Sequence, residues 1–185
     1  MQTGYVTQFY ELLLTRRSVT ELPKLKLPQV LIFTAICALI TMVAVANPWV
    51  YPKVYIGLCL YMALDALPHY AFLSERGLGE RFTQFWLAIQ ATGTFFRMCF
   101  ALIGLLFMHH PVFLVIGYAA LAAAAIYVFI HIYSTGFAVE RIHAVGYFGL
   151  ITLCLWAEIL CVMLILSTMM GGLTALSASV LAIGH

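Results

Sequence analysis

Three strongly ionisable side chains stand inside otherwise apolar stretches of this 185-residue sequence: Asp65, Arg97 and Glu158. A charge in hydrocarbon is costly unless it faces a partner or water, so these groups should point into the interior of a helix bundle. Buried groups of this kind conduct protons or ions, bind metals, or hold helices together by hydrogen bonds. They mark the inside of the fold without naming a reaction.

Arg97 and Glu158 are predicted to lie at the same depth. Each stands about 15 residues from the cytoplasmic end of its apolar stretch, and a rise of ~1.5 Å per residue converts this to about 22 Å. An arginine and a carboxylate at one depth satisfy each other through charge-assisted hydrogen bonds. The sequence therefore predicts an ion pair between these two residues.

A second group of polar residues is expected nearer the cytoplasmic side. Asp65 and His69 are four residues apart and share a helix face. Pro68 stands between them and leaves the Leu64 carbonyl without its helical donor, which favours a kink. The next apolar stretch carries a polar stripe at helical spacing, which predicts a central helix; the stripe consists of Gln90, Thr94 and Arg97.

The residues leave three roles open for this intramembrane polar network. Hydrogen bonds between helices are favoured, because one polar pair suffices for packing whereas a pathway must be continuous across the membrane. The second role is a proton or ion pathway through Asp65, His69, Arg97 and Glu158. The third is a transition-metal site with His69, His131 and His143 as candidate ligands, the first two of which are also the only candidate pair for haem. We predict no metal and no cofactor, and allow only bound lipid.

The composition is that of an integral membrane protein. Hydrophobic residues make up 64% of the chain, charged residues make up 9%, and the mean hydropathy is +1.04. Soluble domains carry about 25% charged residues. The net charge of +2 comes without a basic run, so no nucleic-acid partner is expected. No catalytic motif and no CxxC pair occurs, which argues against an enzyme.

Apolar stretches and their breaks predict an all-α bundle of five transmembrane helices. About 20 apolar residues are needed to cross the hydrocarbon core. Residues 1–27 form a cytoplasmic amphipathic segment, 28–170 form the transmembrane domain, and 171–185 form a short non-cytoplasmic tail. The five spans are expected at about 28–46, 52–73, 82–108, 111–133 and 144–170.

Basic residues set the orientation, since cytoplasmic loops carry an excess of lysine and arginine. With the N-terminus in the cytoplasm, the opposite face receives only Lys53. The C-terminus then lies on the other side of the membrane. The cytoplasmic face receives Arg16, Arg17, Lys24, Lys26, Arg76, Arg81 and Arg141.

Residues 5–19 are predicted to form an amphipathic helix lying in the membrane interface. Gln8, Glu11 and Arg16 face the polar side. The apolar side consists of Tyr5, Val6, Phe9, Leu12 and Leu13. Aromatic residues near span ends, Tyr70 and Tyr133 among them, are also typical of the interface.

Two segments resemble those of a known family. The run GLGERFTQF over 77–85 is similar to the entry into the third span of Yip1-domain membrane proteins, and so is the tyrosine-rich end of the fourth span over 127–136, followed by Glu140 and Arg141. Many members carry a proline where this chain has ATGT at 91–94, and the acidic-tyrosine-glycine-proline motifs of eukaryotic members are absent. The resemblance implies a small bundle that acts in membrane organisation or partner binding.

The alanine run over 119–125, preceded by Gly117, gives the fourth span a smooth surface that another helix can approach closely. Together with the small size of the chain, this surface favours a non-enzymatic membrane scaffold or accessory subunit that packs against other membrane proteins or against itself. The alternative is a proton or ion pathway, or a small transporter component. Inverted repeats, which would favour transport, are not found.

The predicted ion pair yields a test. Replacing either Arg97 or Glu158 by leucine should lower the stability by about 3–5 kcal/mol, because the remaining charge loses its partner, while replacing both should cost less than either single change. Thermal unfolding in detergent measures the three variants. Additive losses in the double variant would show that the two side chains do not interact.

Overall fold

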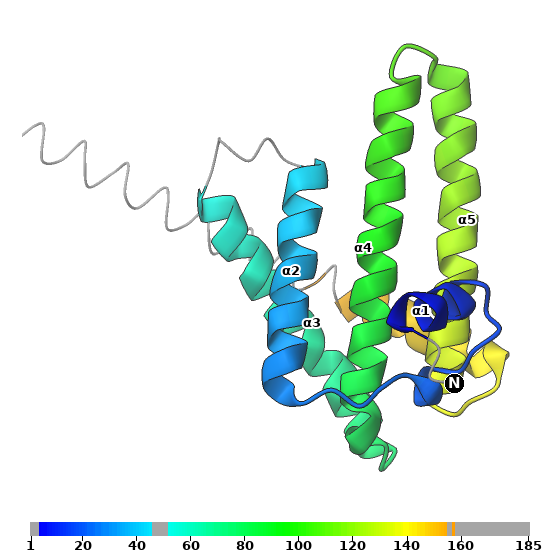
Figure 1. Cartoon of the computed structure of the whole chain (residues 1–185). Coiled ribbons are helices and arrows are strands. Elements are labelled where there is room, and N and C mark those ends of the chain that lie inside the picture. Colours follow the sequence, from blue (N-terminus) through cyan, green and yellow to red (C-terminus); the bar gives the residue numbers. More distant parts are fainter. Residues whose placement is uncertain (1–3, 46–51, 155–156, 158–185) are drawn as a thin grey trace, which may run out of the picture.

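The computed structural model describes residues 4–45, 52–154 and 157. Within this part of the chain every regular element is a helix, as predicted, and no strand occurs (Figure 1). Glu158, the later part of the fifth predicted span and the tail 171–185 lie outside the described residues. The elements are α1 (Tyr5–Leu13), η1 (Val19–Glu21), α2 (Leu27–Val45), α3 (Pro52–Glu75), η2 (Gly79–Arg81), α4 (Phe82–Phe107) and α5 (Pro111–Gly136), followed by a helix over Arg141–Cys154.

Proline and glycine explain several of the helix ends. Pro52 and Pro111 occupy the first positions of α3 and α5, where the missing N–H costs nothing. Helix α3 ends at Glu75, and the chain turns at Gly77, whose φ of 69° suits a residue without a side chain. The Gly77 N–H donates to the Ser74 carbonyl and the Leu78 N–H to the Leu73 carbonyl, which is a Schellman motif. The chain then turns into α4.

Helix α4 is the centre of the described bundle. It contacts α1, η1, α2, α3 and α5, and its most extensive contacts are with α2 and α5. Figure 1 shows α2 and α5 flanking it, with α4 and α5 forming an antiparallel pair joined by the turn at His109 and His110. The central position that its polar stripe predicted is confirmed.

Aromatic packing joins the N-terminal end of α4 to the C-terminal end of α5. Phe85 and Phe137 are fully buried, and their ring centroids lie 5.1 Å apart. The ring of Tyr133 lies 5.4 Å from that of Phe85. Gly136 presents bare backbone to the Phe85 ring, and a β-carbon there would overlap it. The close approach of the two helices therefore requires glycine at this position.

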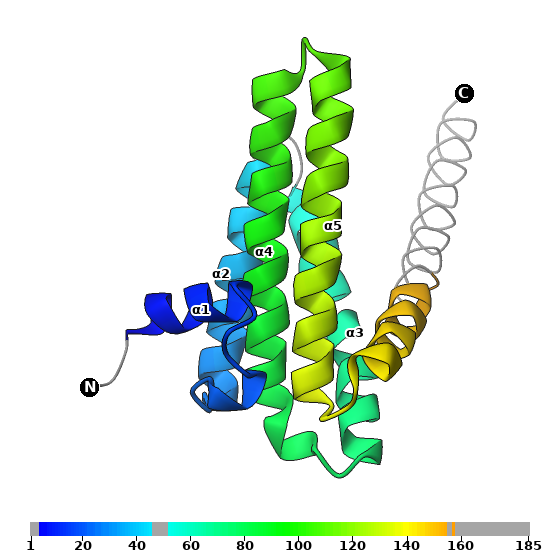
Figure 2. The same ribbon diagram turned by 90° about the vertical axis from the view of Figure 1, so that its right-hand side faces the viewer.

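The N-terminal segment crosses the bundle instead of running along it. Figure 2 shows α1 lying across the long axis of α4 and α5. The predicted helix over 5–19 ends at Leu13, because Thr15 turns the backbone to a φ of 55° and Ser18 then caps η1. Leu12 and Val19 are fully buried. The apolar side of this segment, predicted to face the membrane interface, therefore packs at least partly on the bundle.

Hydrogen bonds hold the segment in place. The Gln84 amide of α4 donates to the carbonyls of Thr20 and Leu22. His131 of α5 donates from Nε2 to the Arg17 carbonyl at 2.9 Å. These bonds satisfy backbone groups that would otherwise be buried without a partner. We call residues 14–22 the N-terminal strap.

Two helices of the described chain are long and apolar enough to cross a membrane, Gly79–Phe107 and Pro111–Gly136. At ~1.5 Å per residue, the 26 residues of α5 extend about 39 Å, more than the ~30 Å of a hydrocarbon core. Two shorter apolar helices, Leu27–Thr41 and Arg141–Cys154, accompany them.

The close approach at Gly136 yields a prediction with a matched control. Gly136→Ala should destabilise the protein by about 1–3 kcal/mol, because the added methyl group overlaps the Phe85 ring. Gly146→Ala meets open space on an exposed helix and should be neutral or stabilise by up to about 1 kcal/mol. Thermal unfolding in detergent compares the two. Equal effects at both positions would contradict the tight packing.

Candidate functional site

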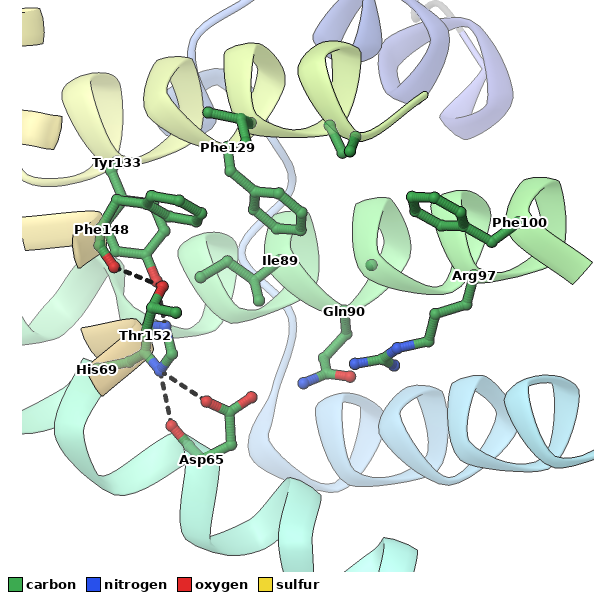
Figure 3. A pocket seen from close by; sticks show the side chains of 14 residues that line it. Asp65, His69, Ile89, Gln90, Arg97, Phe100, Phe129, Tyr133, Phe148 and Thr152 are labelled. Carbon is green, nitrogen blue, oxygen red and sulfur yellow. Dashed lines mark hydrogen bonds and ion pairs between the residues drawn. The ribbon is translucent and has the colours of Figure 1, made fainter. Parts of the chain in front are cut away.

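A pocket of about 310 Å³ lies between α3, α4, α5 and the helix Arg141–Cys154 (Figure 3). Its walls are mainly apolar, with three phenylalanine rings, Phe100, Phe129 and Phe148. Ala122 and Ala125 also line it, so the alanine run of α5 leaves open space here. The polar lining residues are Asp65, His69, Gln90, Arg97, Tyr133 and Thr152.

His69 joins α3 to α5 at one end of this pocket. Its side chain is 1% exposed, with Nδ1 2.6 Å from the Asp65 carbonyl oxygen and Nε2 2.7 Å from the Tyr133 hydroxyl. Because a carbonyl only accepts, we assign the proton to Nδ1, and the neutral ring then accepts at Nε2 from the Tyr133 hydroxyl. Asp65 Oδ1 lies 3.4 Å from Nδ1 and supports the same orientation.

Helix geometry explains how α3 presents this pair. Residues four apart lie one above the other, so His69 reaches back to the turn of Asp65. Pro68 lies inside α3, where it supplies no N–H to the Leu64 carbonyl. The His69 ring is enclosed by aromatic neighbours, with Phe85, Trp86 and Tyr133 centroids at 5.7, 5.8 and 5.8 Å.

Tyr133 is the site residue that sequence reasoning missed. Its position near the end of a span made it look like an interfacial aromatic, yet it is 3% exposed and donates to His69. A signal was present, since His69 is a buried imidazole with one nitrogen turned to its own helix and therefore needs a partner from another helix. The sequence does not say which helix supplies it.

Gln90 and Arg97 line the pocket from α4. Gln90 is 3% exposed, and Figure 3 shows the Arg97 guanidinium pointing toward its amide, on the side of the pocket that Asp65 also faces. Gln90 Oε1 and Arg97 Nη1 are both buried, and neither forms a hydrogen bond within the described part of the chain. Thr94 is buried on the same helix, but it does not line the pocket.

The polar groups form a line that starts near the end of the bundle where α3 ends, α4 begins and α5 ends, and stops partway along the helices. From the helix bounds and a rise of ~1.5 Å per residue, Tyr133 lies about 5 Å, His69 about 9 Å, Asp65 about 15 Å and Arg97 about 22 Å from those ends. Beyond Arg97, α4 continues as MCFALIGLLF without a charged residue. Within the described residues the line is therefore a half-depth inlet.

The three histidines considered as metal ligands take separate partners. His69 bonds to Tyr133, and His131 bonds to the N-terminal strap. His143 lines a different pocket with Arg76, Glu140 and Tyr147. No group of three or more His, Cys, Asp or Glu side chains that could hold a metal ion occurs among the residues that the structure describes.

The structure thus brings Asp65, His69, Gln90 and Arg97 to one pocket, leaves Thr94 beside it, and does not include Glu158 in its described residues. The Arg97–Glu158 pair stays a prediction. In this chain of hydrogen bonds, the Tyr133 hydroxyl donates to His69 Nε2, and His69 Nδ1 donates to the Asp65 carbonyl. The Arg97 guanidinium provides a cation at the deep end of the pocket.

No family model matches the sequence, and no curated protein or solved structure is significantly similar to it. The pocket and the helix surfaces are therefore the observations from which function is argued.

The buried hydrogen bond of His69 yields a prediction. Tyr133→Phe should destabilise the protein by about 1–3 kcal/mol, because His69 Nε2 is left buried without a donor. Tyr147→Phe is the matched control: its hydroxyl accepts from Arg76 at an exposed site, 2.8 Å away, and its loss should cost less than about 1 kcal/mol. Thermal unfolding compares the two variants. A smaller effect at Tyr133 than at Tyr147 would contradict the assigned bond.

Proposed function

We propose that this chain is an integral membrane protein of five spans, with a cytoplasmic N-terminus and the C-terminus on the opposite side. We further propose that it acts as a non-enzymatic scaffold or accessory subunit, packing against other membrane proteins or against a second copy. The observation that carries the proposal is the broad apolar surface of α4 and α5. This surface is incompatible with water and suited to lipid or to another apolar helix.

The apolar surface runs along the outer halves of both helices. Large apolar side chains there are more than half exposed, at 55–70% of their full area. They cluster around the turn that joins α4 to α5, where the hairpin extends beyond α2 in Figure 1. These residues are Leu102, Leu105, Leu106, Met108, Val112, Phe113, Val115 and Ile116.

The distribution of charge supports the orientation. In Figure 2 the α3–α4 loop and the loop after α5 lie at one end of the bundle, with the α4–α5 turn at the other. The charged end carries Arg76, Arg81 and Arg141. The opposite turn carries only His109 and His110. A cytoplasmic location of the charged end follows the lysine and arginine bias.

Small side chains on α5 offer a place where a partner helix can dock. Ala119, Ala120, Ala123 and Ala124 are exposed, so a neighbouring backbone could approach this face closely. The resemblance to Yip1-domain proteins supports the same role, since it implies membrane organisation or partner binding.

The test combines purification with a surface variant. Extraction in mild detergent followed by native mass spectrometry should show a stoichiometric membrane partner or a homo-oligomer. The double variant Ala120→Leu with Ala124→Leu should weaken that assembly, because the two larger side chains hold a partner helix away. Ile32→Leu, at an exposed position of α2, which flanks α4 on the side opposite α5, is the control that should leave assembly intact (Figure 1). A monomer in wild-type extracts would contradict the proposal.

A proton or ion pathway is the second candidate, and the polar line from Tyr133 to Arg97 is the observation that favours it. In proteoliposomes, a conducting chain should lose flux on Asp65→Asn while keeping its fold. Replacing Arg97 and Glu158 together by leucine should also abolish flux, whereas a scaffold should tolerate this change. Wild-type vesicles without proton or ion flux would remove this candidate.

A further inference from the structure

A second pocket, of about 320 Å³, lies at the charged end of the bundle. It is formed by Arg76, which follows α3, by the loop after α5, and by the start of the helix Arg141–Cys154. Figure 2 shows these segments at one end of the molecule. In the proposed membrane orientation this end lies among the lipid headgroups. The inference below therefore rests on the proposed membrane location, but it does not depend on the subunit role.

The Arg76 guanidinium is held in place at this pocket. Its Nη1 donates to the Tyr147 hydroxyl at 2.8 Å, and its Cζ lies 5.5 Å from the centroid of the same ring. The Tyr147 ring is in turn stacked on the buried ring of Phe137, with centroids 5.0 Å apart. One of five guanidinium N–H groups is used in this way. The others can bind an anion with little further loss of side-chain freedom.

The pocket contains two opposite charges that are not paired. Glu140 supplies a carboxylate from the loop after α5, and His143 adds an imidazole that can donate or accept. Neither Arg76 nor Glu140 forms an ion pair with any side chain that the structure describes. Such a pocket is complementary to a ligand that carries an anion and a cation separated by a short spacer.

An apolar surface continues from the pocket along the helix Arg141–Cys154, which leads away from the charged end in Figure 2. His143, Tyr147 and Leu150 share one face of this helix, because they are spaced by four and three residues. Leu150 is 46% exposed, and Leu153, three residues further, is 68% exposed. A lipid with its headgroup in the pocket would place its acyl chains on this surface, which a soluble ligand does not need.

We propose that this pocket binds the headgroup of a zwitterionic phospholipid with a primary ammonium group, of the phosphatidylethanolamine class. The phosphate lies against Arg76 and the ammonium lies against Glu140. A primary ammonium has three N–H donors for a carboxylate, whereas a trimethylated one has none. The Tyr147 ring, which could otherwise attract a quaternary ammonium, is already in contact with Arg76.

Three phospholipids with the same acyl chains test the headgroup. Phosphatidylethanolamine has the full pattern, phosphatidylcholine lacks the ammonium N–H donors, and phosphatidylglycerol lacks the cation. The detergent-purified full chain is mixed with equal amounts of the three, and native mass spectrometry separates the bound lipids by mass. Phosphatidylethanolamine should occupy the chain about tenfold more than either of the others, because only its ammonium donates charge-assisted hydrogen bonds to the carboxylate.

Variants assign the preference to the pocket. Glu140→Gln should abolish the preference over phosphatidylglycerol, and Arg76→Gln should reduce binding of phosphatidylethanolamine about tenfold. Glu80→Gln and Arg81→Gln are matched controls, because they make the same charge changes at the same end of the bundle but outside the pocket. Both should keep the preference. Circular dichroism and the melting temperature establish that the variants are folded, and the competition on the wild-type chain needs no variant.

Three results would overturn the proposal. Equal occupancy by the three lipids is one, since lipid that only coats an apolar surface has no headgroup preference. A preference that survives in Glu140→Gln is another. The third is displacement of the lipid by an equal concentration of soluble O-phosphoethanolamine, which would assign the pocket to a soluble zwitterion. A chain that stays soluble without detergent and binds no lipid would contradict the membrane location as well, whereas the subunit role is tested separately by the assembly state.

Discussion

The contact between His69 and Tyr133 is the interaction on which the interior of this bundle depends. Lipid is as apolar as leucine, so apolar burial does little to choose one arrangement of helices over another inside a membrane. Directional contacts make that choice. The imidazole ties α3 to α5 across the end of α4, with one nitrogen fixed on its own helix and the other on Tyr133. Breaking this contact would leave α3 with few contacts to α5.

The same reasoning explains the N-terminal strap. Its backbone groups lie against the ends of α4 and α5, where water is scarce and an unpaired carbonyl is costly. Gln84 satisfies two of these carbonyls, and His131 satisfies a third. The strap thus connects the N-terminal end of α4 to the C-terminal end of α5, next to the aromatic packing around Gly136. This end of the bundle is built by specific contacts, whereas the opposite end exposes large apolar side chains.

Helix positions could be predicted from the sequence because prolines, glycines and charges cannot continue an apolar helix in lipid. The starts at Pro52, Phe82 and Pro111 were correct, while α5 continues beyond the predicted end at Tyr133 to Gly136. Spacing on one helix also placed Asp65 beside His69. Partners from other helices could not be found this way, since neither periodicity nor depth gives the rotation of one helix about its axis. Tyr133 and the docking of the strap were missed for that reason.

The distribution of polar side chains changes along the length of the helices, at the level of Arg97. Below Arg97 the helices carry polar side chains inward, and above it the outer halves of α4 and α5 expose mainly apolar side chains. A chain that conducted ions would need polar groups along this upper half, where the described parts of α4 and α5 carry no charged side chain. The polar inlet therefore ends at the Arg97 guanidinium, inside a bundle whose outer half is mainly apolar. A carboxylate at that depth, as predicted for Glu158, would satisfy this buried cation.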